Sequence, residues 1–125
     1  ACIGGELPPH VMSWDLMRAA MHARGGATVG YIDHEEAWDM LAHNLELARC
    51  YYANWGQYAR GYVVGHLYWS SQADVSSAID DTARRATSMA RCLDTALSPW
   101  RRVALHPGEP FHGVDAWTSF EPTRR

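Results

Sequence analysis

The chain contains no lysine, and all of its 11 basic residues are arginine. It also lacks any apolar run near the roughly 20 residues that a transmembrane helix needs. The first ten residues, ACIGGELPPH, have neither a basic start nor an apolar segment, so they do not resemble a signal peptide. We therefore expect a cytoplasmic protein with no membrane partner.

Cysteine is scarce, and its spacing matches no metal motif. The three cysteines are Cys2, Cys50 and Cys92, and no CxxC pair occurs. Reduced thiols are the simplest reading for a cytoplasmic chain. A Cys50–Cys92 disulfide stays open if the helices that carry these residues pack side by side.

The charge balance gives no sign of a polyanion partner. The formal net charge is −3, with 47% hydrophobic and 20% charged residues, which is an ordinary globular composition. We therefore expect no nucleic-acid partner. What the chain does have is large rings, with six Trp and six Tyr in 125 residues. Helical proteins use such rings as core anchors, and this length suits one domain.

Helix signals begin after an irregular lead-in over residues 1–12. Ser13 is a candidate N-cap for a helix over 14–24, which the pair Gly25–Gly26 would end. Asp33, followed by Glu36 three residues later, forms a capping-box pattern that predicts a second helix over 34–53.

The same capping pattern recurs at Asn54, with Gln57 three residues later, and predicts a third helix over 55–70. This segment contains Gly61 and Gly65, one turn apart. Glycine in a helix costs about 1 kcal/mol relative to alanine. We therefore expect another backbone to approach this helix closely at the two glycines.

A fourth and longest helix is predicted over 73–97. Its seam alternates by four and three residues: Val75, Ile79, Thr82, Ala86, Met89, Leu93 and Ala96. Asp80–Arg84 and Asp81–Arg85 have favourable i,i+4 spacing. Pro99 should end the helix.

No strand-period run of useful length occurs. The sequence predicts an all-α fold, a compact bundle of about four helices with a loop-rich C-terminal tail. We expect a single helical domain over 1–125, with its core in 13–102 and an irregular tail over 103–125.

At 100° per residue, the second predicted helix separates into two arcs. Its apolar arc contains Ala37, Trp38, Leu41, Leu45, Ala48 and Tyr52. Its polar arc contains Glu35, Glu36, Asp39, His43 and Glu46. Within residues 30–69, the residues expected to build the core are Trp38, Leu41, Leu45, Trp55, Tyr62 and Trp69.

Several ordered motifs in residues 13–102 resemble the bacterial DUF1266 family, a domain of unknown function. They are an Asp-x-x-Arg helix (Asp15, Arg18), a GY[IL]xxEEAW segment (30–38), a helix-opening Trp55, a Y-x-x-G-x-x-x-W run (Tyr62, Gly65, Trp69) and a closing SPW (98–100). The chain departs from the family pattern in two places. Its lead-in is too short for the helical segment that often precedes Asp-x-x-Arg, and residues 101–125 extend beyond the usual end.

The resemblance implies an all-α domain and no established activity. Family members look as if they occur near contact-dependent and Rhs-type toxin loci. This resemblance therefore suggests a role in toxin neutralisation.

The polar arc of the second helix can be read in three ways. It can be a solvated face, or a docking patch for a basic protein partner such as a nuclease toxin, because complementary charge speeds encounter and fixes register. A helix-bundle metal site would require inward-pointing ligands from several helices, and we expect no metal or cofactor.

A second group is Asp15, Arg18 and Glu36. It would tie the first two helices together as an ion network if they pack near one another. It could equally line a small-molecule pocket, since arginine clamps carboxylates and phosphates.

The aromatic stripe at Trp55, Tyr58, Tyr62 and Trp69 suits core packing better than nucleobase stacking, because stacking sites usually add a positive groove. No Walker loop, GxGxxG or HExxH motif occurs. The leading hypothesis is a non-enzymatic protein-binding domain, an immunity protein that blocks a cognate toxin. The alternative is a ligand-binding or enzymatic domain with a pocket at Asp15, Arg18 and Glu36. A structural or oligomeric module is the third reading.

Overall fold

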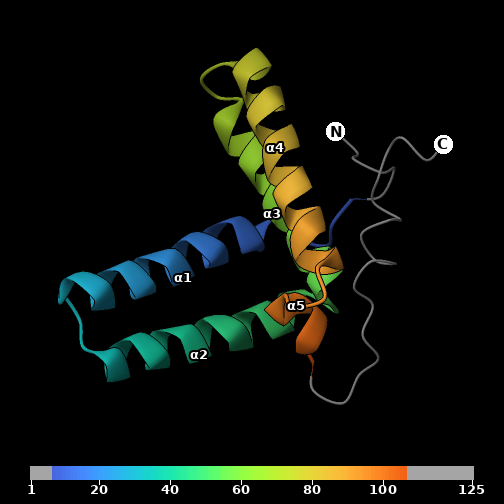
Figure 1. Cartoon of the computed structure of the whole chain (residues 1–125). Coiled ribbons are helices and arrows are strands. Elements are labelled where there is room, and N and C mark those ends of the chain that lie inside the picture. Colours follow the sequence, from blue (N-terminus) through green and yellow to red (C-terminus); the bar gives the residue numbers. More distant parts are fainter. Residues whose placement is uncertain (1–6, 107–125) are drawn as a thin grey trace.

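A computed structural model describes residues 7–106, and every regular element in that range is a helix (Figure 1). The helices are α1 (Met12–Val29), α2 (His34–Tyr51), α3 (Trp55–Ser70), α4 (Val75–Asp94) and α5 (Pro99–Arg102). The all-α prediction is confirmed. So is the expectation that the fourth helix is the longest, with 20 residues.

The helices form two antiparallel hairpins that meet at one junction. Figure 1 shows α1 and α2 projecting in one direction and α3 and α4 in another, with the short α5 beside the point where they meet. Contacts join α1 to both α2 and α3, and α4 to both α3 and α5. The inner ends of the hairpins therefore share a core, and their outer ends diverge.

The capping signals of α2 and α3 act as the sequence predicts. The Asp33 carboxylate accepts from the Glu36 N–H at 2.8 Å, and the Asp33 N–H donates to the Glu36 carboxylate at 3.0 Å. Asn54 accepts from the Gln57 N–H at 2.9 Å in the same way. Both helices begin where predicted. The third also ends at Ser70 as expected, whereas α2 ends two residues early, at Tyr51.

The prediction for the first helix was wrong at both ends. Val11, not Ser13, is the N-cap, and it makes no side-chain cap bond. The Ser13 hydroxyl instead donates to the Tyr58 carbonyl at 2.7 Å, because packing against α3 buries it. The helix also continues through Gly25 to Val29, and Gly30 is its C-cap, with a φ of 84° in the left-handed region that favours glycine.

The two glycines of α3 lie where α1 approaches, as the sequence predicts. A Cβ on Gly61 would lie 2.5 Å from the His10 carbonyl oxygen and 2.6 Å from the Tyr52 hydroxyl. A Cβ on Gly65 would lie 2.7 Å from the Trp14 Cβ. The missing side chains therefore let the start of α1 lie against α3.

The buried side chains form two clusters at the junction. One joins α3 to α4: Ala59, Tyr62, Val63 and Leu93. The other joins α1, α2 and α3 to the segment after α5: Leu16, Ala48, Tyr52, Tyr58 and Leu105. Trp55 and Trp100 stack with centroids 5.4 Å apart and pack against both clusters.

The fourth helix is shorter than predicted, and only the middle of its seam is covered. Thr82 and Leu93 are buried, but Val75 and Ile79 are exposed, and the buried residue at this end of α4 is Ala78, which is not part of the predicted seam. Pro99 does not end α4. It is the first residue of α5, where its missing N–H costs nothing, and Ser98 is the cap.

The predicted core positions Trp38 and Trp69 are also exposed. Trp38 is 70% accessible and Trp69 is 57% accessible. Trp38 lies on the outer half of its hairpin, where it lines an open groove, and Trp69 lies near the outer end of α3, where the ring of Trp14 covers it only in part. Cys50 and Cys92 are free thiols on α2 and α4, so the disulfide left open by the sequence is not formed.

Candidate functional site

The outward face of α2 carries all five residues predicted to bind a partner. Each of them is exposed: Glu35, Glu36, Asp39, His43 and Glu46. They span three turns of one helix, about 16 Å at 1.5 Å per residue. Glu36 is committed to the capping box by its bond to the Asp33 N–H, so three carboxylates and one imidazole remain for an incoming surface.

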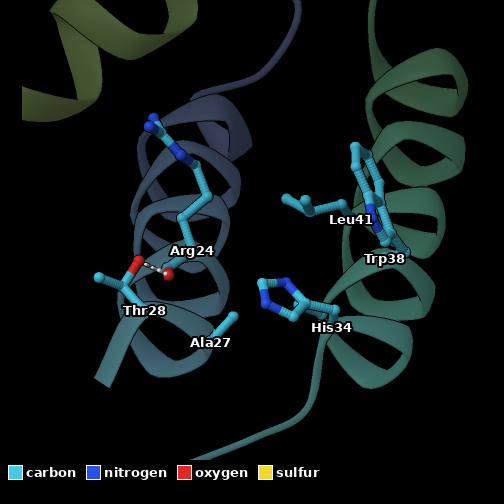
Figure 2. Close-up of a pocket in the computed structure, with 7 residues that line it drawn as sticks. Arg24, Ala27, Thr28, His34, Trp38 and Leu41 are labelled. Atoms are coloured by element: carbon cyan, nitrogen blue, oxygen red, sulfur yellow. Dashed lines mark hydrogen bonds between the residues drawn. The ribbon is translucent and has the colours of Figure 1, made fainter. Parts of the chain in front are cut away.

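Next to this face, the outer halves of α1 and α2 enclose a shallow groove. Its volume is about 260 Å³. Its lining is Arg24, Ala27 and Thr28 from α1, with His34, Ala37, Trp38 and Leu41 from α2. Figure 2 shows His34 and Leu41 reaching from α2 toward α1. The Thr28 hydroxyl donates to the Arg24 carbonyl at 2.9 Å, within α1. The sequence missed this groove because Trp38 was assigned to the core.

The structure does not bring Glu36 to Asp15 and Arg18. Asp15 and Arg18 do pair, at 2.5 Å, on the first turns of α1. Because α1 and α2 are antiparallel, however, Glu36 at the start of α2 lies at the other end of the hairpin (Figure 1). The three-residue pocket suggested by the sequence is therefore not assembled.

The Arg18 guanidinium instead lies over the ring of Trp14, 4.7 Å from its centroid. Trp14 also contacts the rings of Tyr62, His66 and Trp69, at centroid distances of 5.1 to 5.7 Å. The Asp-x-x-Arg motif thus holds a tryptophan between α1 and α3, which is a packing role.

A polar chain links α3 to α4 behind this tryptophan. His66 Nδ1 lies 2.9 Å from the Thr82 hydroxyl, and its Nε2 lies 3.1 Å from the Asp81 carboxylate. An ionised carboxylate only accepts, so Nε2 carries the proton and Nδ1 accepts from Thr82. Nothing in the sequence pointed to these three residues.

The surroundings of His66 and Asp81 set the protonation states of these two side chains. Burial lowers the pKa of His66 most, the Arg85 charge lowers it further, and Asp81 opposes both only in part. Desolvation raises the pKa of Asp81, but hydrogen bonds from Arg85 and Arg84 outweigh it, so the net pKa is lowered. At neutral pH the imidazole is neutral and the carboxylate is ionised.

The hydroxyl of Thr82, the imidazole of His66 and the carboxylate of Asp81 follow one another like the nucleophile, base and orienting acid of a catalytic triad. His66 is only 2% exposed, however, and Thr82 is equally buried in the middle of a helix. No substrate can reach the hydroxyl. These three hydrogen-bonded side chains join α3 to α4, which is a structural role. Arg85 supports the same contact by donating to the Tyr62 hydroxyl at 2.5 Å.

Arg84 also pairs with Asp81, at 3.2 Å, rather than with Asp80 as the sequence predicts. Both arginines therefore share the Asp81 carboxylate, Arg84 at i,i+3 and Arg85 at i,i+4, and the same carboxylate also contacts the buried imidazole of His66. Asp81–Arg85 itself forms as predicted, at 3.4 Å.

The aromatic stripe of α3 is mostly unavailable for base stacking. Tyr58 and Tyr62 are buried, and Trp55 is covered by Trp100. Within residues 7–106, no group of three or more His, Cys, Asp or Glu side chains could hold a metal ion. In that same range no helix is long and apolar enough to cross a bilayer.

The fold and these sites describe an all-helical protein with an open, charged hairpin. Residues 6–105 match a family described as "Protein of unknown function (DUF1266)". This match covers most of the chain, and the chain belongs to that family.

Among curated proteins, the chain is similar to "Uncharacterized protein YbeR" of Escherichia coli strain K12. The identity is 35% over 65 residues, which is 51% of this chain and 27% of the relative. The chain thus spans about a quarter of that protein's length. No solved structure matches it.

Proposed function

We propose that this chain is a non-enzymatic protein-binding domain that uses the outward face of α2. The observation that carries the proposal is the exposure of Trp38, which is 70% accessible one helical turn after Glu35, at the edge of the acidic face. Exposed tryptophan is an energetic anchor in many interfaces. An acidic surround favours a partner with a basic surface.

The finer proposal is an immunity role: the chain binds and blocks a cognate toxin with a basic surface in the cytoplasm. The acidic face of α2 supports this reading, because the active-site cleft of a nuclease is positively charged. The alternative of a small-molecule pocket has no such support, since Asp15 and Arg18 pair with each other and Glu36 caps its own helix.

The test is binding to the product of the neighbouring gene, with both proteins purified. Reversing the charge of Glu35 and Asp39 to arginine should slow association at least tenfold at low salt, because surface charges act mainly on the association rate. The fold should survive, since both side chains are exposed. Glu36 is left intact because its reversal would break the capping box.

A matched control reverses two exposed carboxylates of α4, Asp80 and Asp94, and should leave the association rate unchanged. Equal loss in both double variants would show a general charge effect rather than a docking face. If no neighbouring product binds at all, the immunity proposal fails. If a stable dimer forms without a partner, the oligomeric-module reading replaces it.

A further inference from the structure

The α3–α4 hairpin is held together in two different ways along its length. Toward the junction, α4 packs on α3 through the buried cluster that contains Val63 and Leu93. Toward the turn between the two helices lies the outer segment of α4, Val75–Thr82, in which only Ala78 and Thr82 are buried. Apolar burial therefore holds the inner part of α4 and contributes little to the outer segment.

The contacts of His66 join this outer segment to α3. The Thr82 hydroxyl lies 2.9 Å from Nδ1 of His66, and the Asp81 carboxylate lies 3.1 Å from its Nε2. The other main contact of α4 is with α5, which lies at the opposite end of α4 (Figure 1). The attachment of the outer segment therefore depends largely on one buried imidazole.

The charged groups that act on the imidazole from α4 have opposite effects. Asp81 favours a proton on His66, and Arg85 opposes it. The Asp81 carboxylate is also shared with Arg84 and Arg85, at 3.2 and 3.4 Å. Its negative charge is therefore already compensated in part by two guanidinium groups.

The groups on α1 and α3 do not add to the attraction from Asp81. From α1, the neutral ring of Trp14 lies against the imidazole, with centroids 5.1 Å apart. The Arg18 guanidinium lies over the same indole and is paired with Asp15. On α3, the Tyr62 hydroxyl accepts from Arg85. Asp81 is thus the carboxylate that would stabilise a proton on His66.

A proton on His66 costs the closed hairpin free energy. The Thr82 hydroxyl can turn from donor to acceptor, so both ring contacts survive protonation. The cost arises because the cation sits in a site that is 2% exposed, beside Arg85. These two effects hold the pKa of His66 below its ordinary value despite Asp81. Separating the outer segment from α3 lets water reach the imidazole, so acid favours the open form.

We propose that the outer segment of α4 is a pH-sensitive switch, which separates from α3 at His66 on acidification while the junction stays folded. The open form exposes His66 and Ala78 to water and leaves the cluster around Val63 and Leu93 in place. The switch lies in the α3–α4 hairpin and is independent of the binding face proposed on α2.

Hydrogen exchange of the full chain, resolved by residue with NMR, tests whether the opening is local. At pH 7.5 the amides of residues 78–82 should be protected at least tenfold less than those of residues 89–93. Their protection should also change little with low concentrations of urea, because a local opening exposes little surface.

The same amides test whether acid drives the opening. Between pH 7.5 and 5.5 the protection factors of residues 78–82 should fall three- to tenfold. Tenfold is about the limit at this pH, because an exposed imidazole has a pKa of about 6.5 and each pH unit below it changes the opening equilibrium by at most tenfold.

The start of α2, at the outer end of the other hairpin, is an internal control. Its amides over residues 38–41 should change less than twofold between the two pH values. His66→Gln keeps a donor and an acceptor without titrating, so it should abolish the acid dependence of residues 78–82. His22→Gln, at an exposed position on α1, should preserve this dependence.

Three results would overturn the proposal. Equal protection and equal urea dependence over 78–82 and 89–93 would show that α4 opens only with the whole protein. Equal protection of 78–82 at both pH values, or an acid dependence that persists in His66→Gln, would remove the imidazole as the switch. If His66→Gln does not fold, the wild-type measurements and the α2 control decide by themselves, since an equal loss at 38–41 assigns the effect to the protein as a whole.

Discussion

The α1–α2 hairpin has an inner end and an outer end. The same two amphipathic helices form both ends, yet the two ends have different surroundings. At the inner end, α3 lies so close to α1 that only glycine fits at Gly61. At the outer end, Gly25 has nothing within 4 Å of where a Cβ would lie, and Trp38 is mostly exposed. The comparison separates residues that hold the fold from residues that the described part of the chain leaves exposed.

The largest effect should come from the buried junction. Leu93 is 0% exposed in the α3–α4 cluster, and Leu93→Ala should lower the free energy of unfolding by about 2–5 kcal/mol through lost burial and a cavity. Leu97, four residues later and 73% exposed, is the matched control, and Leu97→Ala should change it by less than about 0.5 kcal/mol. Urea unfolding measures both. Equal losses would mean that Leu97 is buried in solution.

Alanine at two helical glycines should give effects of opposite sign. Gly61→Ala places a methyl group against the His10 carbonyl and the Tyr52 hydroxyl, so it should destabilise by about 1–3 kcal/mol. Gly25→Ala meets open space and should stabilise by about 0.5–1 kcal/mol. Thermal unfolding tests the pair. A stable Gly61→Ala protein would show that α1 does not approach α3 as described.

A loss of comparable size should follow from removing one hydroxyl at the junction. The Tyr52 hydroxyl accepts from the Ser13 N–H at 2.8 Å and donates to the His10 carbonyl at 2.9 Å. Tyr52→Phe leaves these groups unpaired and should cost about 1–3 kcal/mol. Tyr68→Phe changes an exposed ring and should cost nothing measurable. If the two variants unfold at the same urea concentration, the buried hydrogen bonds contribute little.

The smallest effect is a pH dependence. The folded pKa values of His66 and Asp81 both lie below their ordinary values, so the unfolded chain binds more protons as pH falls. The associated stability is fully present above the unfolded pKa of His66, about 6.5, and is lost as pH falls below it.

Unfolding at pH 7.5 and 5.5 should therefore show lower stability at the acidic pH. His66→Gln should reduce this difference, although it also lowers stability at both values. His22, which is exposed on α1, is the control, and His22→Gln should preserve the wild-type dependence. A variant at His66 with an unchanged pH profile would assign the dependence to other groups.

Local signals predicted the helices well where a side chain acts on its own backbone. Asp33 with Glu36 and Asn54 with Gln57 cap the helices that they mark. The same reasoning failed at Ser13 and Pro99. The Ser13 hydroxyl bonds a distant carbonyl instead of its own helix, and a proline that can end one helix can equally begin the next.

The candidate site was only half predictable. The acidic arc from Glu35 to Glu46 follows from helical angles alone, because a charged face opposite an apolar one is solvated in almost any fold. The exposure of Trp38 does not follow. Its arc is the core-facing one, and only the length of the covering elements decides whether a residue on it is buried.

The sequence by itself determined the all-α class, the starts of α2 and α3, and the need for a close approach at Gly61 and Gly65. These depend on backbone propensities and on contacts within a few residues. Only the tertiary structure decided that Asp15 and Arg18 support Trp14 rather than form a pocket with Glu36, that His66 is bonded on both nitrogens, and that Trp38 lies in an open groove. Those outcomes depend on where each hairpin ends relative to the next, which a single helical period does not encode.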